Sequence, residues 1–221
     1  MKTSQKKYIL FFLGMSFFTS HLFSQNEKNF WYFGNKAGID FNTAPPAVVN
    51  NGMLSTQEGC AAISDKITGQ LLFYTNGVSV LNSSHQVMSN GNGLFAGPSA
   101  TQSSIIVPDP ANNLLYYLFT VADFAGSNGA TFGGLAYSVV DMSLNSGLGN
   151  VTTKNQVITS VDTVAEKITA VNHCNGKDYW VIVHRWHTNE FYSFQVSTTG
   201  IAAPVISGVG TVYQSVSGLS L

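Results

Sequence analysis

The sequence predicts an all-β protein, a β-propeller with about four strands in each blade. The main observation is a repeat: the stretch from Gln57 to Tyr74 matches segments 44 and 108 residues further along, with no gap in either alignment. Each copy has two apolar runs around a polar turn and then more strand, the signature of a propeller blade or a similar β array. The 21 glycines suit tight turns between short strands, and 12% aromatic residues suit a substantial core.

Residues 1–24 are predicted to be a cleaved secretory signal. Lys2, Lys6 and Lys7 precede an apolar run over residues 8–18, and small or polar residues follow to a cut after Ser24. The run is shorter than the ~20 residues that span a bilayer. We therefore expect a secreted or cell-surface protein without membrane insertion after signal removal. No cysteine lies near the cut, so we expect no lipid anchor.

The charge balance excludes a nucleic-acid-binding protein. Without the signal the chain has 7 basic and 11 acidic residues, a net charge of −4, and therefore no basic footprint for nucleic acid or anionic lipid. The remaining length and the 44% apolar content are enough for one domain with a core.

The mature chain opens with strands that look like the end of a blade. Strands are expected near Phe30–Phe33, Gly38–Phe41 and Ala47–Val49, within residues 29–50. They correspond to the last three strands of a repeat unit whose first strand is missing, so we interpret them as closing strands.

Three whole blades are expected at about 57–90, 101–160 and 164–207, and residues 208–221 read as the start of a further repeat. A Gly/Ser/Ala-rich insertion from Asp123 to Gly134 lengthens one loop of the second blade, a common place for binding. The expected strands include Leu71–Thr75, Val78–Leu81, Gln86–Met88, Leu114–Val121, Leu135–Asp141 and the runs ITAVN, DYWVIVH, EFYSFQV and APVIS.

The ring formed by these blades is expected to be incomplete. Open blade edges would then promote self-association. The alternative is a closed four-bladed ring in which Thr211–Ser215 supplies the missing strand beside Trp31–Phe33, and that ring would be a compact monomer.

The histidines and cysteines carry weak signals. His184 and His187 have an HxxH spacing, but residues three apart on a strand point to opposite faces. Hairpin histidines are thus preferred to a metal site, and no metal or cofactor is expected. Cys60 and Cys174 could form a bridge in an exported protein, but their places in non-neighbouring units favour two free thiols.

The best candidate site is a set of three equivalent polar residues. Glu58, Gln102 and Glu166 occupy the same repeat position ahead of the first strand, which in a propeller lines the central channel. They form either a polar rim for a cation or a sugar hydroxyl, or caps on neighbouring backbone. No serine, histidine and acid stand in a recognisable catalytic motif, so no catalytic residues are expected.

Several segments resemble one family. They are NFWYFGNKAGIDF, TQEGCAAISD, GQLLFYTNGVSVLN, TQSSIIVPDP, GLAYSVVDMSLN and DYWVIVHRWHTNEFYSF. They resemble the N-terminal β-propeller-like region of large secreted Bacteroidetes surface proteins of the gliding-motility-associated, type B sorting domain group. The resemblance covers nearly the whole mature chain and implies export by type IX secretion, and it gives no catalytic residues to carry over to this sequence. The chain lacks the downstream repeats and the sorting domain of that group.

The sequence therefore predicts an exported, non-catalytic β-propeller module for binding or adhesion, with a surface glycan or protein as partner. The alternatives are a carbohydrate-active enzyme or lectin-like sugar-binding domain at the channel mouth, and a structural spacer of a larger surface protein. Crowded acids at that mouth would favour the enzyme, an exposed aromatic shelf would favour sugar binding, and the absence of both would favour the spacer.

Overall fold

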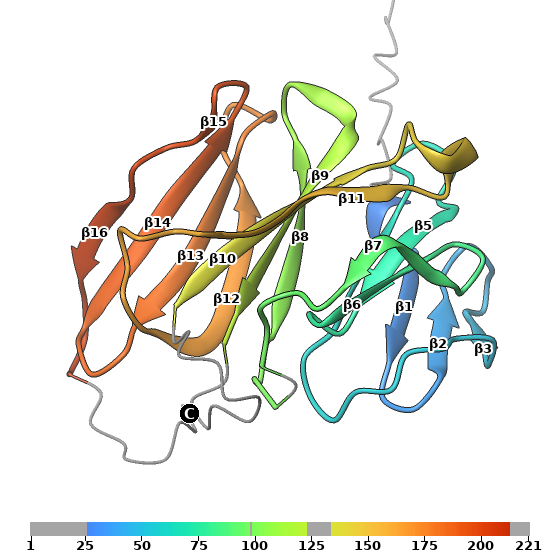
Figure 1. The fold of residues 1–221 in the computed structure, drawn as a ribbon, viewed down its shortest axis with the longest axis horizontal. Coiled ribbons are helices and arrows are strands. Elements are labelled where there is room, and N and C mark those ends of the chain that lie inside the picture. Colours follow the sequence, from blue (N-terminus) through green and yellow to red (C-terminus); the bar gives the residue numbers. More distant parts are fainter. Residues whose placement is uncertain (1–25, 98, 123–133, 213–221) are drawn as a thin grey trace, which may run out of the picture.

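The computed structural model describes residues 26–97, 99–122 and 134–212, and this part of the chain is all-β (Figure 1). The predicted signal, most of the predicted insertion and the end of the last predicted repeat lie outside the described residues. The strands are β1 (Phe30–Phe33), β2 (Ala37–Asp40), β3 (Ala47–Val49), β4 (Ala61–Ser64), β5 (Leu71–Thr75), β6 (Ser79–Asn82), β7 (Val87–Asn92), β8 (Ser104–Asp109), β9 (Asn112–Val121), β10 (Leu135–Asp141), β11 (Asn150–Val157), β12 (Val164–Asn172), β13 (Tyr179–Arg185), β14 (Glu190–Ser197), β15 (Gly200–Ile201) and β16 (Val205–Gly208). Helical structure among the described residues is limited to two single 3-10 turns, η1 (Asn26–Lys28) and η2 (Asn145–Gly147).

The strands form consecutive antiparallel groups. Strands β1 to β3 make the N-terminal sheet, β4 to β7 the first unit, β8 to β11 the second unit, and β12 to β16 the third unit, in which both β15 and β16 pair with β14. The strands predicted at Phe30–Phe33, Ala47–Val49, Leu71–Thr75 and Leu135–Asp141 are confirmed with the same bounds. The other strands with predicted bounds shift by a few residues, and neither β11 nor β15 was predicted.

The first and second units join into one eight-stranded sheet. Their last strands, β7 and β11, meet in parallel through the pair Asn150–Ser89, and Lys154 Nζ donates to Asn90 Oδ1 at 2.9 Å across the same junction. The first strands of the two units, β4 and β8, also contact each other, so this sheet curls into a nearly closed, barrel-like shape (Figure 1). No local pattern in the sequence indicated the junction.

The strand register corrects the repeat alignment of the third unit. The equivalent cross-strand pairs are Ile63–Phe73, Val107–Tyr117 and Val171–Trp180. Val171 lies 108 residues after Ile63, but Trp180 lies only 107 after Phe73. At the turn the alignment at 108 holds, because the closing pairs Ser64–Leu71 and Asn172–Tyr179 are 108 residues apart and the two turns have the same length. A bulge at Leu72 in β5 shifts the register by one beyond it, so from Phe73 onward the gapless alignment does not give the equivalent positions. A one-residue shift in register moves the side chain of every following residue to the opposite face of the sheet.

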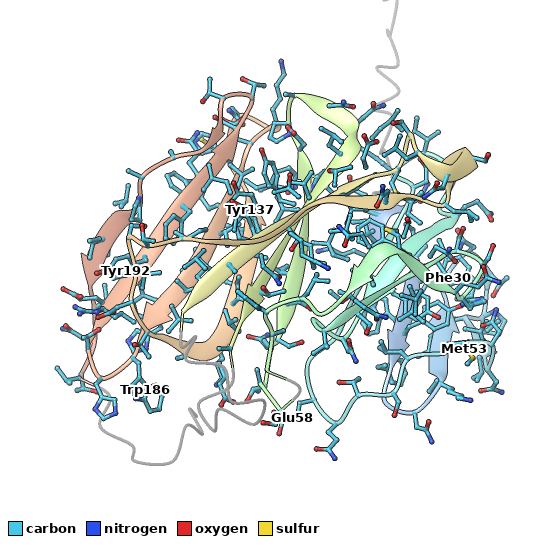
Figure 2. The ribbon with its side chains drawn as sticks, in the orientation of Figure 1. Phe30, Met53, Glu58, Tyr137, Trp186 and Tyr192 are labelled. Carbon is cyan, nitrogen blue, oxygen red and sulfur yellow. The ribbon has the colours of Figure 1, made fainter. Side chains whose placement is uncertain are left out.

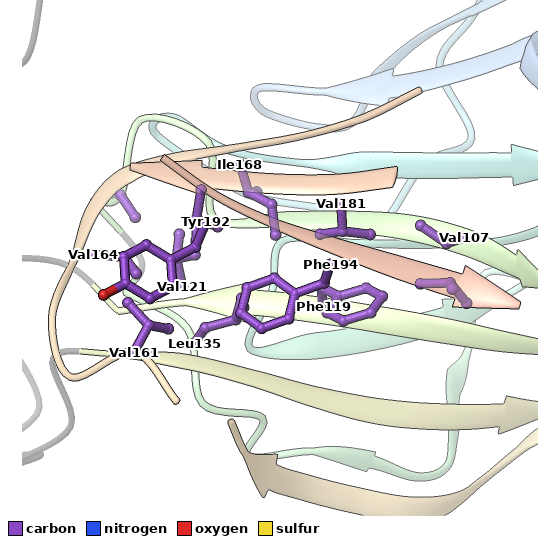
Figure 3. Packing of buried hydrophobic residues seen from close by; sticks show 13 residues of the cluster. Val107, Phe119, Val121, Leu135, Val161, Val164, Ile168, Val181, Tyr192 and Phe194 are labelled. Atoms are coloured by element: carbon purple, nitrogen blue, oxygen red, sulfur yellow. The ribbon is translucent and has the colours of Figure 1, made fainter. Parts of the chain in front are cut away.

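Alternating side chains of one strand enter different cores. In β5, Phe73 packs toward the second unit while Tyr74 packs toward the N-terminal sheet. In β9, Leu118 packs toward the first unit while Phe119 packs toward the third. The period of two in a strand makes this possible. The described chain is therefore a series of four β layers with three apolar cores between them, the largest of which lies between the second and third units (Figure 3).

The core between the N-terminal sheet and the first unit contains a polar network. The rings of Tyr32 and Tyr74 stack with centroids 4.4 Å apart. Asn51 accepts a hydrogen bond from Tyr32 Oη at 3.0 Å and lies 2.8 Å from His85 Nε2, while His85 Nδ1 lies 3.0 Å from Tyr74 Oη. Tyr74 Oη also accepts the Met53 N–H at 3.0 Å. The amide nitrogen of Asn51 faces His85, so Nε2 of His85 accepts a hydrogen bond from Asn51 and Nδ1 donates one to Tyr74. This arrangement requires a neutral imidazole.

This network predicts a pH-dependent stability. Burial lowers the pKa of His85 below its ordinary value, so the unfolded state binds the proton more readily. Stability is therefore complete above the unfolded pKa of ~6.5 and declines as the pH falls through it. We expect the urea midpoint to fall between pH 7.5 and 5.5, and His85→Asn to reduce that fall. His187→Asn, which alters an exposed turn histidine, is the control. An unchanged pH slope in His85→Asn would contradict the assignment.

Candidate functional site

The first strands of the three units and the strand β1 surround one cavity. Its volume is about 1120 Å³, and its wall includes Ala61–Ile63 of β4, Ile105–Val107 of β8 and Ile168–Val171 of β12. These segments make the middle of the cavity apolar. The first strand of every unit lines the cavity because the units have equivalent structures and each directs its first strand toward the cavity.

One end of the cavity is polar through repeat-equivalent residues. Glu58 and Gln102 line it and are exposed, and Figure 2 shows Glu58 at the lower margin of the molecule. Nearby, Ser104 also lines the cavity; its hydroxyl is shielded from solvent and has no hydrogen-bond partner within the described residues. This end can therefore offer a carboxylate and an amide to a ligand.

Glu166, the third predicted member, is placed differently. The sequence put it ahead of the first strand, but it lies within β12, is 7% exposed and is not among the residues that line the cavity. A bulge between Val164 and Ile168 moves the start of β12 to an earlier residue. Glu166 Oε2 accepts the Thr101 N–H at 3.4 Å, and its carbonyl accepts the Gln102 N–H at 2.9 Å. The residue thus caps the backbone of the second unit.

The opposite end of the cavity is polar through residues that the sequence did not reveal. Glu27 and Lys28 of η1 line it together with Tyr179 of β13. Burial, with a smaller contribution from the Glu27 charge, raises the pKa of Tyr179 to about 12, so its hydroxyl stays protonated. Glu27 belongs to no repeat, which is why the repeat could not identify it. Only the approach of η1 to β4 brings it here, where Asn26 Nδ2 donates to the Ile67 carbonyl at 2.9 Å.

Residues His184 to His187 (HRWH) lie at the end of β13 and in the turn of the hairpin that joins β13 and β14. The ring of His184 lies against Phe191 with centroids 4.7 Å apart, and that of His187 lies against Trp186 at 4.9 Å. Arg185 binds Asp162 with Nε–Oδ1 at 2.9 Å and Nη2–Oδ2 at 3.0 Å. This two-bond contact lowers the pKa of Asp162 to about 2. The segment is thus accounted for by hairpin packing and ion pairing.

The two cysteines lie in unlike surroundings. Cys60 lines the cavity just before β4, and burial raises the pKa of its thiol. Cys174 is exposed in the turn between β12 and β13, with Sγ 3.8 Å from His173 Nδ1. Both are free thiols.

The described residues contain neither a metal-binding cluster nor a membrane-spanning helix. Within residues 26–97, 99–122 and 134–212, no group of three or more His, Cys, Asp or Glu side chains could hold a metal ion. No helix of the same residues is long and apolar enough to cross a membrane. Comparison with models of protein families, with curated proteins and with solved structures found no match.

Proposed function

We propose that the chain is an exported β-propeller module that binds a glycan in the cavity between its first strands. The observation that carries the proposal is the arrangement of the cavity: apolar strand walls between two polar ends. Sugars present apolar C–H faces together with hydroxyl groups, and sites for such ligands combine apolar surface with a few placed polar groups. The four-layer stack of antiparallel strands, with the first strand of each unit facing one cavity, supports the propeller assignment.

The charges of the lining favour a neutral ligand. Glu27 and Glu58 are acids and Lys28 is a base, so the polar ends together carry a small negative charge. An anionic ligand would be repelled at Glu58, whereas a hydroxyl group can donate to its carboxylate and to the Gln102 amide oxygen. Tyr179 adds an aromatic face and a hydroxyl at the other end.

A binding role is favoured over hydrolysis. Glycoside hydrolysis uses two carboxyl groups within roughly 5–9.5 Å of each other across the scissile bond. Glu58 precedes β4, while Glu27 lies by the segment that follows β4. The two acids of the cavity therefore flank opposite ends of a strand. Exported to the cell surface, such a module would serve in adhesion to a glycan.

The test is a glycan array followed by calorimetry on the oligosaccharide that binds. We expect Glu58→Ala to weaken that affinity by roughly 10- to 100-fold, as for loss of a hydrogen bond to a charged group, and Gln102→Ala to weaken it by roughly 2- to 10-fold, as for loss of a neutral one. Gln86→Ala, an exposed glutamine in the turn between β6 and β7, is the matched control and should bind normally. Absence of binding across the array, or unchanged affinity in both variants, would contradict the proposal.

A further inference from the structure

The two end layers of the stack each expose one apolar face. Among the described residues, both faces of the middle layers are covered, whereas the N-terminal sheet and the third unit have neighbours on one side only. The Trp31 face of the N-terminal sheet consists of Trp31, Phe33, Ile39, Phe41 and Val48. The apolar members of the Trp180 face of the third unit are Val171, Trp180, Ile182, Phe191 and Val205, and the same face also carries the polar residues Thr169, His184, Ser193, Gln195 and Ser207.

Several large apolar side chains in these two faces are exposed to solvent, which is unfavourable. Trp31 is 51% exposed and Val48 75% exposed, and in the other face Val171 is 49% and Val205 55% exposed. Trp31, Ile39 and Val48 form one row across three strands. Contiguous apolar surface of this kind marks an interaction site.

The two faces are complementary halves of a contact that the molecule already makes three times. Phe73 and Tyr117 each face the layer that follows them in the chain. Trp180 occupies the same register position in the third unit, so the Trp180 face is the one that would meet a following layer. Conversely, Tyr74 and Leu118 face the preceding layer. The Trp31 face takes that same role in the N-terminal sheet, since Tyr32 points toward the first unit.

We propose that a second copy of this chain covers both faces, with the Trp31 face of each copy packed against the Trp180 face of the other. Each copy carries both halves of the contact, so no other partner is required. Two such contacts related by a two-fold axis close a ring, as head-to-tail interfaces do when the rotation closes. The cavity would be completed as well, because Trp31 and Phe33 of one face and Val171 of the other belong to its wall.

This inference is independent of the proposed glycan. Dimerisation rests on the two apolar faces, and glycan binding rests on Glu58 and Gln102. Because Trp31 also lines the cavity, the variants that separate the proposals are Trp180→Glu, outside the cavity lining, and Glu58→Ala and Gln102→Ala, outside both faces. It also differs from pairing through strand edges, because here side-chain faces rather than backbone groups make the contact.

The test is light scattering on the chromatographed protein over a dilution series. We expect twice the mass of one chain, and a dimer dissociation constant raised at least ~30-fold in Trp31→Glu and in Trp180→Glu, as for a buried aromatic anchor. Ile67→Glu, at a side chain that is 84% exposed and outside both faces, should remain dimeric. Circular dichroism shows whether each variant is folded.

A mixture of the two variants sharpens the result. Trp31→Glu retains an intact Trp180 face and Trp180→Glu an intact Trp31 face, so an equimolar mixture should recover dimer through one unaltered contact. An unaltered protein that is monomeric at all concentrations would mean that another polypeptide or another part of this chain covers the faces, and would overturn the proposal. An open-ended series of masses would also overturn it, because the ring would not close.

Discussion

Phe119→Ala is expected to lower the free energy of unfolding by about 3–5 kcal/mol, the usual cost of removing a buried aromatic ring. Phe119 of β9 is fully buried and belongs to the core between the second and third units, together with Phe194 of the facing sheet (Figure 3). Its ring lies 6.1 Å from that of Tyr137. Domains are stable by only ~5–15 kcal/mol in total, so the variant should be close to unfolding at 37 °C.

Urea unfolding measures this effect, and one fixed protein concentration keeps any stabilisation by self-association comparable between the two proteins. Ile67→Ala is the control because its side chain is 84% exposed, and it should change stability by less than ~0.5 kcal/mol. A loss below 1 kcal/mol for Phe119→Ala would mean that the second and third units do not share this core.

Gly59→Ala is expected to cost roughly 1–3 kcal/mol through overpacking, and to weaken glycan binding as well. A β-carbon at residue 59 would meet the Ser103 amide nitrogen, the Ser103 hydroxyl at 2.6 Å and the Ala100 carbonyl oxygen at 2.9 Å. Two of these are backbone atoms, which cannot rotate away. The Gly59 N–H also donates to that Ala100 carbonyl at 3.2 Å. Glycine is thus required at this close approach of the segments that precede β4 and β8.

The same contact lies between Glu58 and Gln102, so any separation of the two backbones moves the polar end of the cavity. Thermal unfolding and calorimetry with the glycan measure the two effects. Gly208→Ala is the matched control, since its β-carbon would meet no atom closer than 3.8 Å. Stability and affinity equal to those of the unaltered protein would refute the close approach.

Most strands could be predicted from the sequence because their signals are local. Alternation of apolar residues and turn residues such as Asn76-Gly77 located β5 and β6 to within a residue. The register of the third unit could not be obtained in this way. The first unit has a bulge at Leu72 that the third unit lacks, and this bulge changes the face that each following strand residue presents. Only the pairs Ile63–Phe73 and Val171–Trp180 reveal the difference.

The candidate site was predictable only where the repeat determined it. Glu58 and Gln102 were found because each precedes the first strand of its unit, and both line the cavity. Glu166 satisfied the same pattern, but a bulge in β12 buries it against the second unit. Glu27 and Tyr179 meet through long-range packing of η1 and β13, and no sequence spacing records such an approach.

The most direct test of a ligand-binding cavity between the first strands uses Cys60, which lines its wall without alteration of the site. In a Cys174→Ser variant, which leaves Cys60 as the one thiol in the chain, the rate of maleimide labelling is measured by mass spectrometry with and without the glycan at saturation. Because thiol reactivity depends on access as well as on the thiolate fraction, we predict that the bound glycan slows labelling of Cys60 at least several-fold. A labelling rate that saturating glycan leaves unchanged would contradict the placement of the ligand in this cavity.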